Sequence, residues 1–260
     1  GPATCSPERV RALVDGGMNM ARINMSHGDH EGHARVIGHL REAADLSGQP
    51  VAILADLAGP KIRVGDLPNP VKLIPGERVT LAPANFVQDG DISTTYAHLA
   101  EDLKPGDHVL LDDGLLELEC VEILGPRASF VVVRGGVLTS SKGLNMPGVD
   151  VQVPSLTEKD LVDLDFALSQ GVEYVGLSFV RTGADVEDLK KRVGQKALVV
   201  AKIEMARALD ALDAIIAAAD AVMVARGDLG VELPFEQVPL AQKRIVRMAN
   251  AHARPVITAT

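Results

Sequence analysis

Cysteine, tryptophan and basic residues are scarce in this sequence, and each shortage excludes a class of protein or site. The two cysteines, Cys5 and Cys120, lie far apart, which excludes a disulfide framework and offers no cysteine spacing for a metal. Lysine and arginine number 26 against 35 aspartates and glutamates, and the net charge of -9 excludes the basic surface that binds nucleic acids or anionic membranes. We therefore expect neither nucleic acid nor a membrane as a partner.

Long apolar runs are missing as well. No segment approaches the roughly 20 residues that cross a bilayer, and the opening residues GPATCSPERV have neither the basic nor the apolar region of a secretion signal. These absences, together with the low cysteine content, predict a cytoplasmic protein. The sequence does not begin with methionine, so we expect the chain to be part of a longer protein.

Short apolar runs alternate with helix-patterned segments along most of the chain. The expected strands are 18–24, 51–56, 173–179, 197–204, 220–228 and 254–260, and the expected helices cover about 30–47, 183–193 and 204–219. Such alternation predicts a parallel sheet. Because the strands are almost continuously apolar, both faces of the sheet are expected to be covered, as in an α/β barrel or a doubly wound sheet.

Residues 66–153 follow a different pattern. Their strand-like runs are separated by Pro-Gly and Asp-Gly turn signals, and no strong helical pattern lies between them. We interpret them as a small β-rich domain inserted after the strand at 51–56, with residues 1–65 and 154–260 forming the α/β domain. An insertion beside strand ends is typical of a lid over a site.

Polar residues follow the apolar part of nearly every expected strand. Residues two apart on a strand point to the same face, so three pairs are expected to project together: Arg22 with Asn24, Lys202 with Glu204, and Arg226 with Asp228. A strand that simply exits into solvent explains one such pair. Recurrence on several strands favours a site at the carboxyl edge of the sheet, where α/β proteins bind ligands.

These residue types suit a phosphorylated substrate. Glu204 and Asp228 offer carboxylate oxygens, and Mg²⁺ is bound by one or two carboxylates together with substrate oxygens. Lys202 and Arg22 can neutralise a phosphoryl group during its transfer. Gly227 permits close backbone approach, and the amides that enter the next helix can face an anion.

An ordered set of motifs resembles the pyruvate kinase family over essentially all 260 residues. The motifs are ARINMSHG, DLAGPKIR, DDG, SKGLNMPG, EKD, GLSFVR, KIE, VARGDLGVELP and, near the end, QKR with RPVITAT. The resemblance implies a TIM (β/α)8-type barrel with an inserted β-barrel lid. It also implies the phosphotransferase reaction of glycolysis, in which phosphoenolpyruvate and ADP give pyruvate and ATP, and a homotetramer.

The resemblance assigns roles to individual residues. It implies that Glu204 and Asp228 hold Mg²⁺ or Mn²⁺ and that Lys202 acts on the phosphoryl group and the developing enolate. Arg22 is implied to hold phosphate and Thr260 to face the carbon that is protonated, which makes Lys202, Arg22 and Thr260 the expected catalytic residues. The substrate is expected to lie against Arg22, Lys202, Gly227, Asp228 and Thr260, and the nucleotide near His27, Arg63, Asp113 and Lys142.

One departure from the family pattern concerns potassium. Many family members bind K⁺ through residues that correspond to Asn24, Ser26 and Asp56, a hydroxyl residue directly after that aspartate, and an acid further on. Here the last two positions are Leu57 and Lys61. Leucine offers no side-chain oxygen, and a lysine ammonium can take the place of a monovalent cation. We therefore predict that K⁺ is not required and that Lys61 is a built-in cation.

A second departure is the number of barrel strands. Six are expected in this chain, with the first and eighth strands of a complete barrel absent. Two alternatives to an active kinase stay open on this evidence. The chain could be a catalytically silent fragment or scaffold, or the barrel could belong to a lyase that acts on phosphoenolpyruvate or pyruvate.

Overall fold

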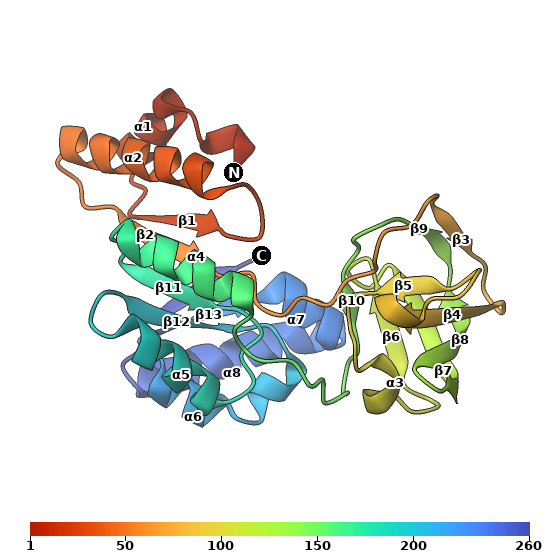
Figure 1. Cartoon of the computed structure of the whole chain (residues 1–260). Coiled ribbons are helices and arrows are strands. Elements are labelled where there is room, and N and C mark those ends of the chain that lie inside the picture. Colours follow the sequence, from red (N-terminus) through yellow and green to blue (C-terminus); the bar gives the residue numbers. More distant parts are fainter.

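The computed structural model describes residues 1–260, with the side chain of Pro2 left out of the description. The helices are α1 (Pro7–Asp15), α2 (His30–Ser47), α3 (Leu99–Asp102), α4 (Glu158–Ser169), α5 (Gly183–Val193), α6 (Leu212–Ala218), α7 (Arg226–Glu232) and α8 (Val238–Ala251). Short 3-10 helices cover Pro2–Thr4, Ala84–Phe86, Ala206–Leu209 and Phe235–Gln237. Figure 1 shows two lobes, one of mixed helices and strands and one made mostly of strands.

The first lobe is built on a parallel six-stranded sheet. Its strands are β1 (Met20–Asn24), β2 (Ala52–Asp56), β11 (Tyr174–Leu177), β12 (Leu198–Ile203), β13 (Ala221–Ala225) and β14 (Val256–Ala259), and they lie side by side in that order. Every neighbouring pair is parallel. The sheet is an incomplete TIM-type barrel, which confirms the expected fold class and the six strands.

Alternation along these strands divides the apolar residues between two cores. Ile53 and Val199 point outward into the large core beneath the helices, whereas Leu54 and Val200 belong to a separate cluster with Met223 on the inner face. Because strand side chains alternate with a period of two, the residue two positions after Leu54 or Val200 also faces inward. These positions are Asp56 and Lys202, so the inner face changes from apolar to charged at the carboxyl edge.

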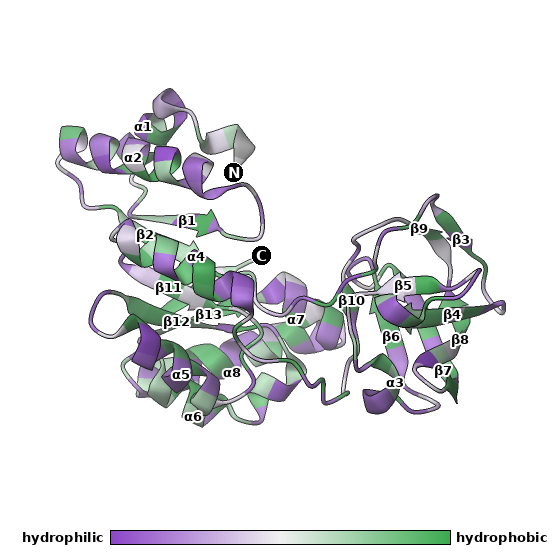
Figure 2. Cartoon of the chain, viewed as in Figure 1, coloured by the Kyte–Doolittle hydropathy of each residue, from purple (hydrophilic) through white to green (hydrophobic). Residues whose placement is uncertain are grey.

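The helices that cover the outer face form where their sequences predict. Helix α2 begins after Asp29, whose side chain accepts a hydrogen bond from Gly32 N at 2.7 Å, and it ends at Gly48 in a left-handed conformation. Helix α5 begins with a capping box formed by Thr182 and Asp185. Polar and apolar colours alternate along these helices in Figure 2, and the apolar stripes pack on the sheet. Among the described residues, none of the helices is long and apolar enough to cross a membrane.

The single helix predicted over 204–219 is wrong. Met205 is extended, Ala206–Leu209 forms a 3-10 helix, and only Leu212–Ala218 is α-helical. Glu204 cannot start a helix here because its side chain is held inside the sheet by Lys202 and by the backbone of Phe179. The α-helical part of the segment therefore begins only at Leu212.

The second lobe contains the strands between the two halves of the barrel sheet. Strands β4 (Arg78–Pro83), β5 (Ile92–Thr94), β6 (His108–Leu111), β7 (Leu116–Leu124), β8 (Arg127–Arg134) and β10 (Leu144–Asn145) form one sheet, and β3 (Val71–Leu73) pairs with β9 (Gly136–Leu138). A separate apolar core fills this lobe, and it includes Val64 and Met146 on the connections to the barrel. The limits 66 and 153 of the inserted domain stay a prediction. We call this lobe the lid.

Candidate functional site

A group of buried charges lies at the carboxyl edge of the barrel sheet. The Lys202 Nζ atom is 2.8 Å from Glu204 Oε1, 3.0 Å from Asp56 Oδ1 and 2.7 Å from Ser178 Oγ. The exposed fraction is 6% for Lys202, 2% for Glu204, 2% for Ser178 and 1% for Asp56. We call these four residues the buried charge cluster. The expectation that Lys202 and Glu204 project together is confirmed.

The fold brings these side chains together from three neighbouring strands. Asp56 ends β2, Ser178 follows β11 and Lys202 lies in β12, and β11 is paired with both of the other strands. Gly176 on β11 leaves room between them, since a Cβ atom at this position would lie 3.3 Å from Asp56 Oδ1. Ser178 completes the contacts because its hydroxyl accepts from Lys202 and donates to the Leu57 carbonyl at 2.7 Å.

The cluster keeps Lys202 charged despite its burial. Burial by itself lowers the pKa of Lys202, but the adjacent Glu204 and Asp56 carboxylates outweigh this effect and raise the pKa above its ordinary value. For Glu204 the balance is different. Burial raises the pKa of its carboxyl, Lys202 opposes the rise, and the negative charge of Asp228 adds to it. A further positive charge next to Glu204 would therefore stabilise its ionised form.

Phe179 holds the second oxygen of Glu204. Its N–H donates to Glu204 Oε2 at 2.7 Å, and its φ of 54° is a left-handed conformation that bulky residues rarely adopt. A backbone outlier beside buried charges indicates a geometry that the surrounding structure enforces. The neighbouring turn is equally tight, because a Cβ atom on Gly59 would lie 2.9 Å from both Phe179 and Ser178.

Arg22 extends the cluster toward solvent. Its Nε atom is 2.5 Å from Asp56 Oδ2, and its side chain is 52% exposed while that of Asp56 is 2% exposed. Asp56 thus lies between two cations, with one carboxylate oxygen facing Lys202 and the other facing Arg22. The ion pair engages Nε and fixes the plane of the guanidinium, whose other nitrogens remain available for an anion.

The expected pairing of Arg226 with Asp228 on a strand is wrong. Strand β13 ends at Ala225, and both residues belong to the first turn of α7, where spacing by two no longer places side chains on one face. The turn nevertheless reaches the next strand, because Arg226 Nε donates to the Ala259 carbonyl at 2.8 Å. A Cβ atom on Gly227 would lie 3.4 Å from the backbone of Thr260, so Gly227 and Thr260 are neighbours as expected.

Glu204 and Asp228 fit the divalent cation that the resemblance implies. Asp228 lies close enough for its charge to raise the pKa of Glu204, and a cation between the two carboxylates would relieve that repulsion. The described residues contain no group of three or more His, Cys, Asp or Glu side chains arranged to hold a metal. A cation at this pair therefore needs further oxygen ligands from substrate or water.

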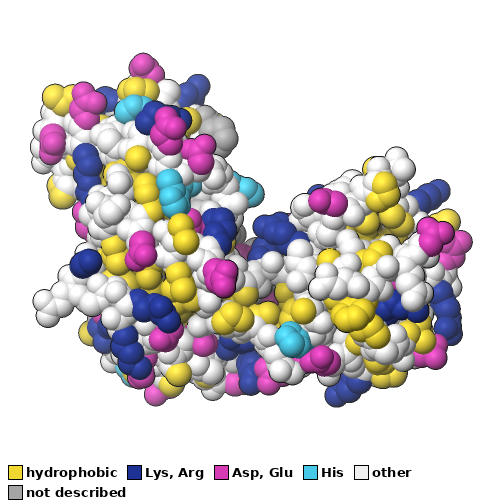
Figure 3. Space-filling view, viewed as in Figure 1, with side chains coloured by type: hydrophobic (Ala, Val, Ile, Leu, Met, Phe, Trp, Pro, Cys, Tyr) yellow, Lys and Arg dark blue, Asp and Glu magenta, His cyan; other side chains and the backbone are white. Residues whose placement is uncertain are grey.

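Four of the remaining predicted residues meet where the lid joins the barrel. Lys61 Nζ is 3.9 Å from Asp113 Oδ1, and Lys142 Nζ is 2.8 Å from Asp112 Oδ1. Arg63 donates to the Ser141 carbonyl at 2.9 Å. Of these four residues, Lys61 lines a cleft that is bounded from the barrel side by Asp228 and Glu232 and from the lid connections by Lys61 and Asn145. Figure 3 shows the hollow between the lobes with Lys and Arg side chains at its rim.

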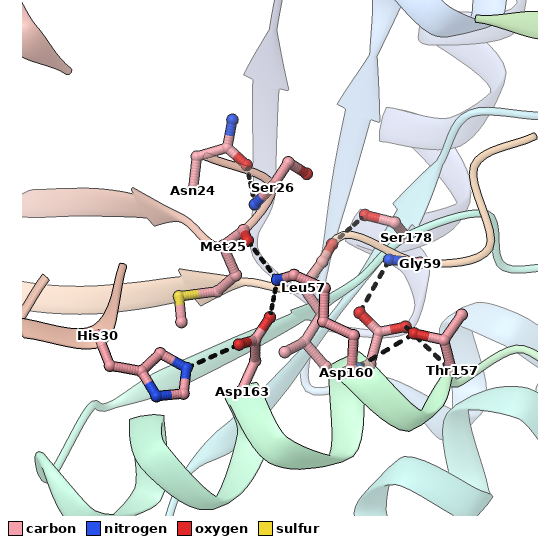
Figure 4. Close-up of polar contacts among 11 residues, drawn as sticks. Asn24, Met25, Ser26, His30, Leu57, Gly59, Thr157, Asp160, Asp163 and Ser178 are labelled. Atoms are coloured by element: carbon pink, nitrogen blue, oxygen red, sulfur yellow. Dashed lines mark hydrogen bonds and ion pairs between the residues drawn. The ribbon is translucent and has the colours of Figure 1, made fainter. Parts of the chain in front are cut away.

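The residues of the predicted monovalent-cation region are already engaged. Asn24 Oδ1 accepts from Ser26 N at 3.1 Å, Asp56 faces Arg22 and Lys202, and the Leu57 carbonyl accepts from Ser178. Figure 4 shows Asn24, Ser26, Leu57 and Ser178 at this point of the sheet edge. Lys61 instead faces the lid carboxylate Asp113. His27 lies in the loop after β1, on the barrel side.

Sequence reasoning missed Ser178, Phe179 and the second role of Asp56. Ser178 and Phe179 belong to the motif GLSFVR, but nothing in their residue types indicates a hydroxyl beneath Lys202 or a strained amide on Glu204. Asp56 was assigned to the cation region only, because its contact with Lys202 crosses a strand that is far away in the sequence. A single polar residue inside an apolar run was the available signal for Ser178.

Comparison with known proteins agrees with this geometry. A family model described as "Pyruvate kinase, barrel domain" matches residues 1–260. The pyruvate kinase of Mycobacterium intracellulare is 49% identical over 265 residues, which cover 100% of this chain and 56% of that protein. The pyruvate kinase of Corynebacterium glutamicum is 47% identical over 266 residues, which cover 100% of this chain and 56% of that protein. The pyruvate kinase of Geobacillus stearothermophilus is 43% identical over 269 residues, which cover 100% of this chain and 46% of that protein. The chain spans about half the length of the curated relatives it matches, and it belongs to the pyruvate kinase family.

Proposed function

We propose that the chain supplies the catalytic barrel and lid of a pyruvate kinase, which transfers the phosphoryl group of phosphoenolpyruvate to ADP. The observation that carries the proposal is the buried charge cluster beside Asp228. It provides a charged lysine at the carboxyl edge of the sheet, a carboxylate that gains from a cation, and an arginine held at the rim. This combination suits a reaction that depends on positioning and charge neutralisation.

The residues of this chain can be given roles in that reaction. Arg22 holds the phosphate while the bond from phosphorus to the enol oxygen breaks and a bond to a β-phosphate oxygen of ADP forms. Lys202 faces the enolate oxygen and stabilises the negative charge that develops there. The enolate then takes a proton on carbon at the Thr260 side, which gives pyruvate, and Gly227 lies against the substrate carboxylate. Glu204 and Asp228 would hold a divalent cation, Mg²⁺ or Mn²⁺, which would supply further positive charge next to the substrate.

The nucleotide side of the proposal rests on the lid. Arg63 and Lys142 supply positive charge for the phosphates of ADP, His27 in the barrel loop after β1 offers a ring nitrogen for a hydrogen bond, and Asp113 approaches the site when the lid closes. The lid also disfavours the lyase alternative, because lyase chemistry on a barrel does not need it. The complete set formed by Lys202, Glu204 and Asp228 disfavours a silent scaffold.

We also propose that activity does not depend on K⁺. The support is that Leu57 has no side-chain oxygen and that Asp56 already faces two protein cations. A role for Lys61 as the built-in cation requires that it leave Asp113, from which it is separated by 3.9 Å. A homo-oligomeric enzyme in the cytoplasm completes the proposal, and light scattering of the purified protein checks the assembly.

The test is ATP formation from phosphoenolpyruvate and ADP with Mg²⁺, in potassium-free buffer and again with K⁺. It is run on this 260-residue chain and on the product of the complete reading frame. Equal turnover in both buffers supports the kinase and its independence of potassium. Strong activation by K⁺ would overturn the potassium proposal alone. No turnover by the complete product in either buffer would remove the kinase proposal.

A further inference from the structure

One helix outside the barrel sheet holds two of the loops that carry site residues. Helix α4 contacts the loop after β1 through Lys159, whose Nζ donates to the Met25 carbonyl at 2.8 Å. It contacts the loop after β2 through Asp160, whose side chain accepts from Gly59 N at 3.0 Å. The first loop carries Ser26, two residues after the end of β1 at Asn24, and the second carries Leu57 and Lys61. The first turn of α4 is therefore a common support for both loops.

The contact with the first loop is reinforced by a buried carboxylate. Asp163 Oδ2 is 2.5 Å from Lys159 Nζ, and Asp163 Oδ1 is 2.8 Å from His30 Nε2 at the start of α2. The Asp163 side chain is 5% exposed, and the His30 ring stacks on Phe166 with 4.2 Å between ring centroids. Figure 4 shows Met25, His30 and Asp163 converging from the loop after β1, from α2 and from α4. Both ends of the loop between β1 and α2 are thus fastened to α4.

The pair of Lys159 with Asp163 differs from an ordinary pair of opposite charges four residues apart on a helix, in which both side chains are exposed to water. Asp188 and Arg192 on α5 form such a pair, with side chains 49% and 45% exposed. Pairs of this kind contribute little to stability because water solvates both partners. Lys159 differs because its acidic partner is buried and because the same ammonium donates to a backbone carbonyl on another element. That carbonyl belongs to the residue between Asn24 and Ser26.

We propose that Lys159 is a positioning residue for the loop after β1, which closely follows the proposed phosphate-binding residue Arg22, a role that rests on the proposed function. By fixing the Met25 carbonyl, it holds Asn24 and Ser26 at the sheet edge next to Arg22, so that less loop ordering is needed when phosphoenolpyruvate binds. The hydrogen bonds of Lys159 go to Met25 and Asp163, and neither residue belongs to the buried charge cluster. Its loss is therefore expected to weaken substrate binding more than the chemical step.

The test compares Lys159→Met with Lys159→Arg in the product of the complete reading frame. Methionine keeps the length of the side chain and removes both hydrogen bonds, whereas arginine can donate to the carboxylate and to the carbonyl. We expect Lys159→Met to raise KM for phosphoenolpyruvate by about tenfold with kcat changed less than about threefold, and Lys159→Arg to restore most of the loss. Calorimetry of phosphoenolpyruvate binding in the presence of Mg²⁺ should show the same loss of affinity.

Matched controls separate positioning from a general structural role. Lys191→Met removes an exposed lysine on α5, and Asp188→Asn removes the carboxylate of an exposed pair, whereas Asp163→Asn removes the buried carboxylate next to Lys159. We expect both α5 controls to keep KM and Asp163→Asn to raise it. An unchanged KM in Lys159→Met, or an arginine variant as defective as the methionine variant, would overturn the role of Lys159 while leaving the kinase intact. An inactive unmodified protein would overturn both proposals.

Discussion

The barrel edge and the base of the lid both contain paired charges, and the pair of Lys202 with Glu204 at the barrel edge is closer and more buried than the pair of Lys61 with Asp113 at the lid base. Lys202 lies 2.8 Å from Glu204, and the side chains are 8% and 2% exposed. Lys61 lies 3.9 Å from Asp113, and those side chains are 31% and 72% exposed. Charges interact strongly where water is excluded and weakly where it is present. The barrel pair is therefore the stronger interaction, whereas the more exposed pair at the lid base is weak.

The largest effect is expected from Lys202→Met. The change removes the charge that we propose to face the enolate oxygen, and it leaves Asp56 and Glu204 buried without their common partner. We expect kcat to fall by about a thousandfold or more and the free energy of unfolding to fall by about 3 kcal/mol. Steady-state kinetics and urea unfolding measure the two effects, and Lys191→Met on α5 is the exposed control. Full turnover by Lys202→Met would remove Lys202 from the reaction.

Asp56→Asn is expected to have the next largest effect. Asparagine keeps one oxygen but presents an NH₂ group toward either Arg22 or Lys202, both of which are donors. We expect kcat to fall by about a hundredfold because both cations lose their alignment. Asp188→Asn in the exposed pair on α5 serves as the control and should keep wild-type kinetics. Similar kinetics for the two variants would show that burial of Asp56 has no bearing on the reaction.

The difference between these two regions also explains how far the sequence was informative. Lys202 and Glu204 were predicted as a pair because local alternation along one strand determines where they point. Asp228 was correctly predicted to lie near Glu204. It was predicted to lie on a strand, however, and it lies in the first turn of helix α7. Its position depends mainly on where β13 ends, which the apolar run reveals.

Contacts that cross between elements could not be predicted in this way. The hydrogen bond from Lys202 to Ser178 and the hydrogen bond from Lys159 to Met25 join residues 24 and 134 positions apart, and periodicity within one element contains no information about them. Lys159 lies in the first turn of helix α4, and this turn holds two loops that come from distant parts of the sequence. The position of Lys61 beside the lid was missed for the same reason.

Lys61→Met tests the proposed role of the lid-base lysine. If Lys61 serves as the built-in cation when the lid closes, its loss should lower turnover by about tenfold in potassium-free buffer, and added K⁺ should restore part of it. The melting temperature should stay unchanged, because the pair with Asp113 is exposed. Rates are measured over a series of KCl concentrations, with tetramethylammonium chloride as the ionic-strength control. Equal turnover of Lys61→Met and the unmodified protein without K⁺ would contradict the role.

The smallest effect is expected at Glu232, which lies between the two regions. It ends α7 on the barrel, and its Oε1 accepts from Asn145 Nδ2 on the lid connection at 3.3 Å. Burial raises the pKa of the Glu232 carboxyl above its ordinary value of 4.5, and the charge of Asp228 adds to the rise, although hydrogen bonds from Asn145 and Ala206 oppose it. Ionised Glu232 therefore lowers the stability of the folded protein at neutral pH.

Glu232→Gln should remove this loss of stability, and the gain in melting temperature should depend on pH. A raised folded-state pKa means that the stability associated with protonated Glu232 is present below about pH 4.5 and is lost as the pH rises through the folded-state value. Glutamine is neutral throughout and keeps an oxygen for Asn145, so the variant should melt about 2 °C higher than the unmodified protein near pH 7.5. The difference should vanish toward pH 4.5, and the exposed control Glu236→Gln should show none at any pH. A variant that melts lower at pH 7.5 would mean that the charged hydrogen bond to Asn145 outweighs burial, and the junction of lid and barrel would then resemble the fixed barrel edge more than the exposed lid base.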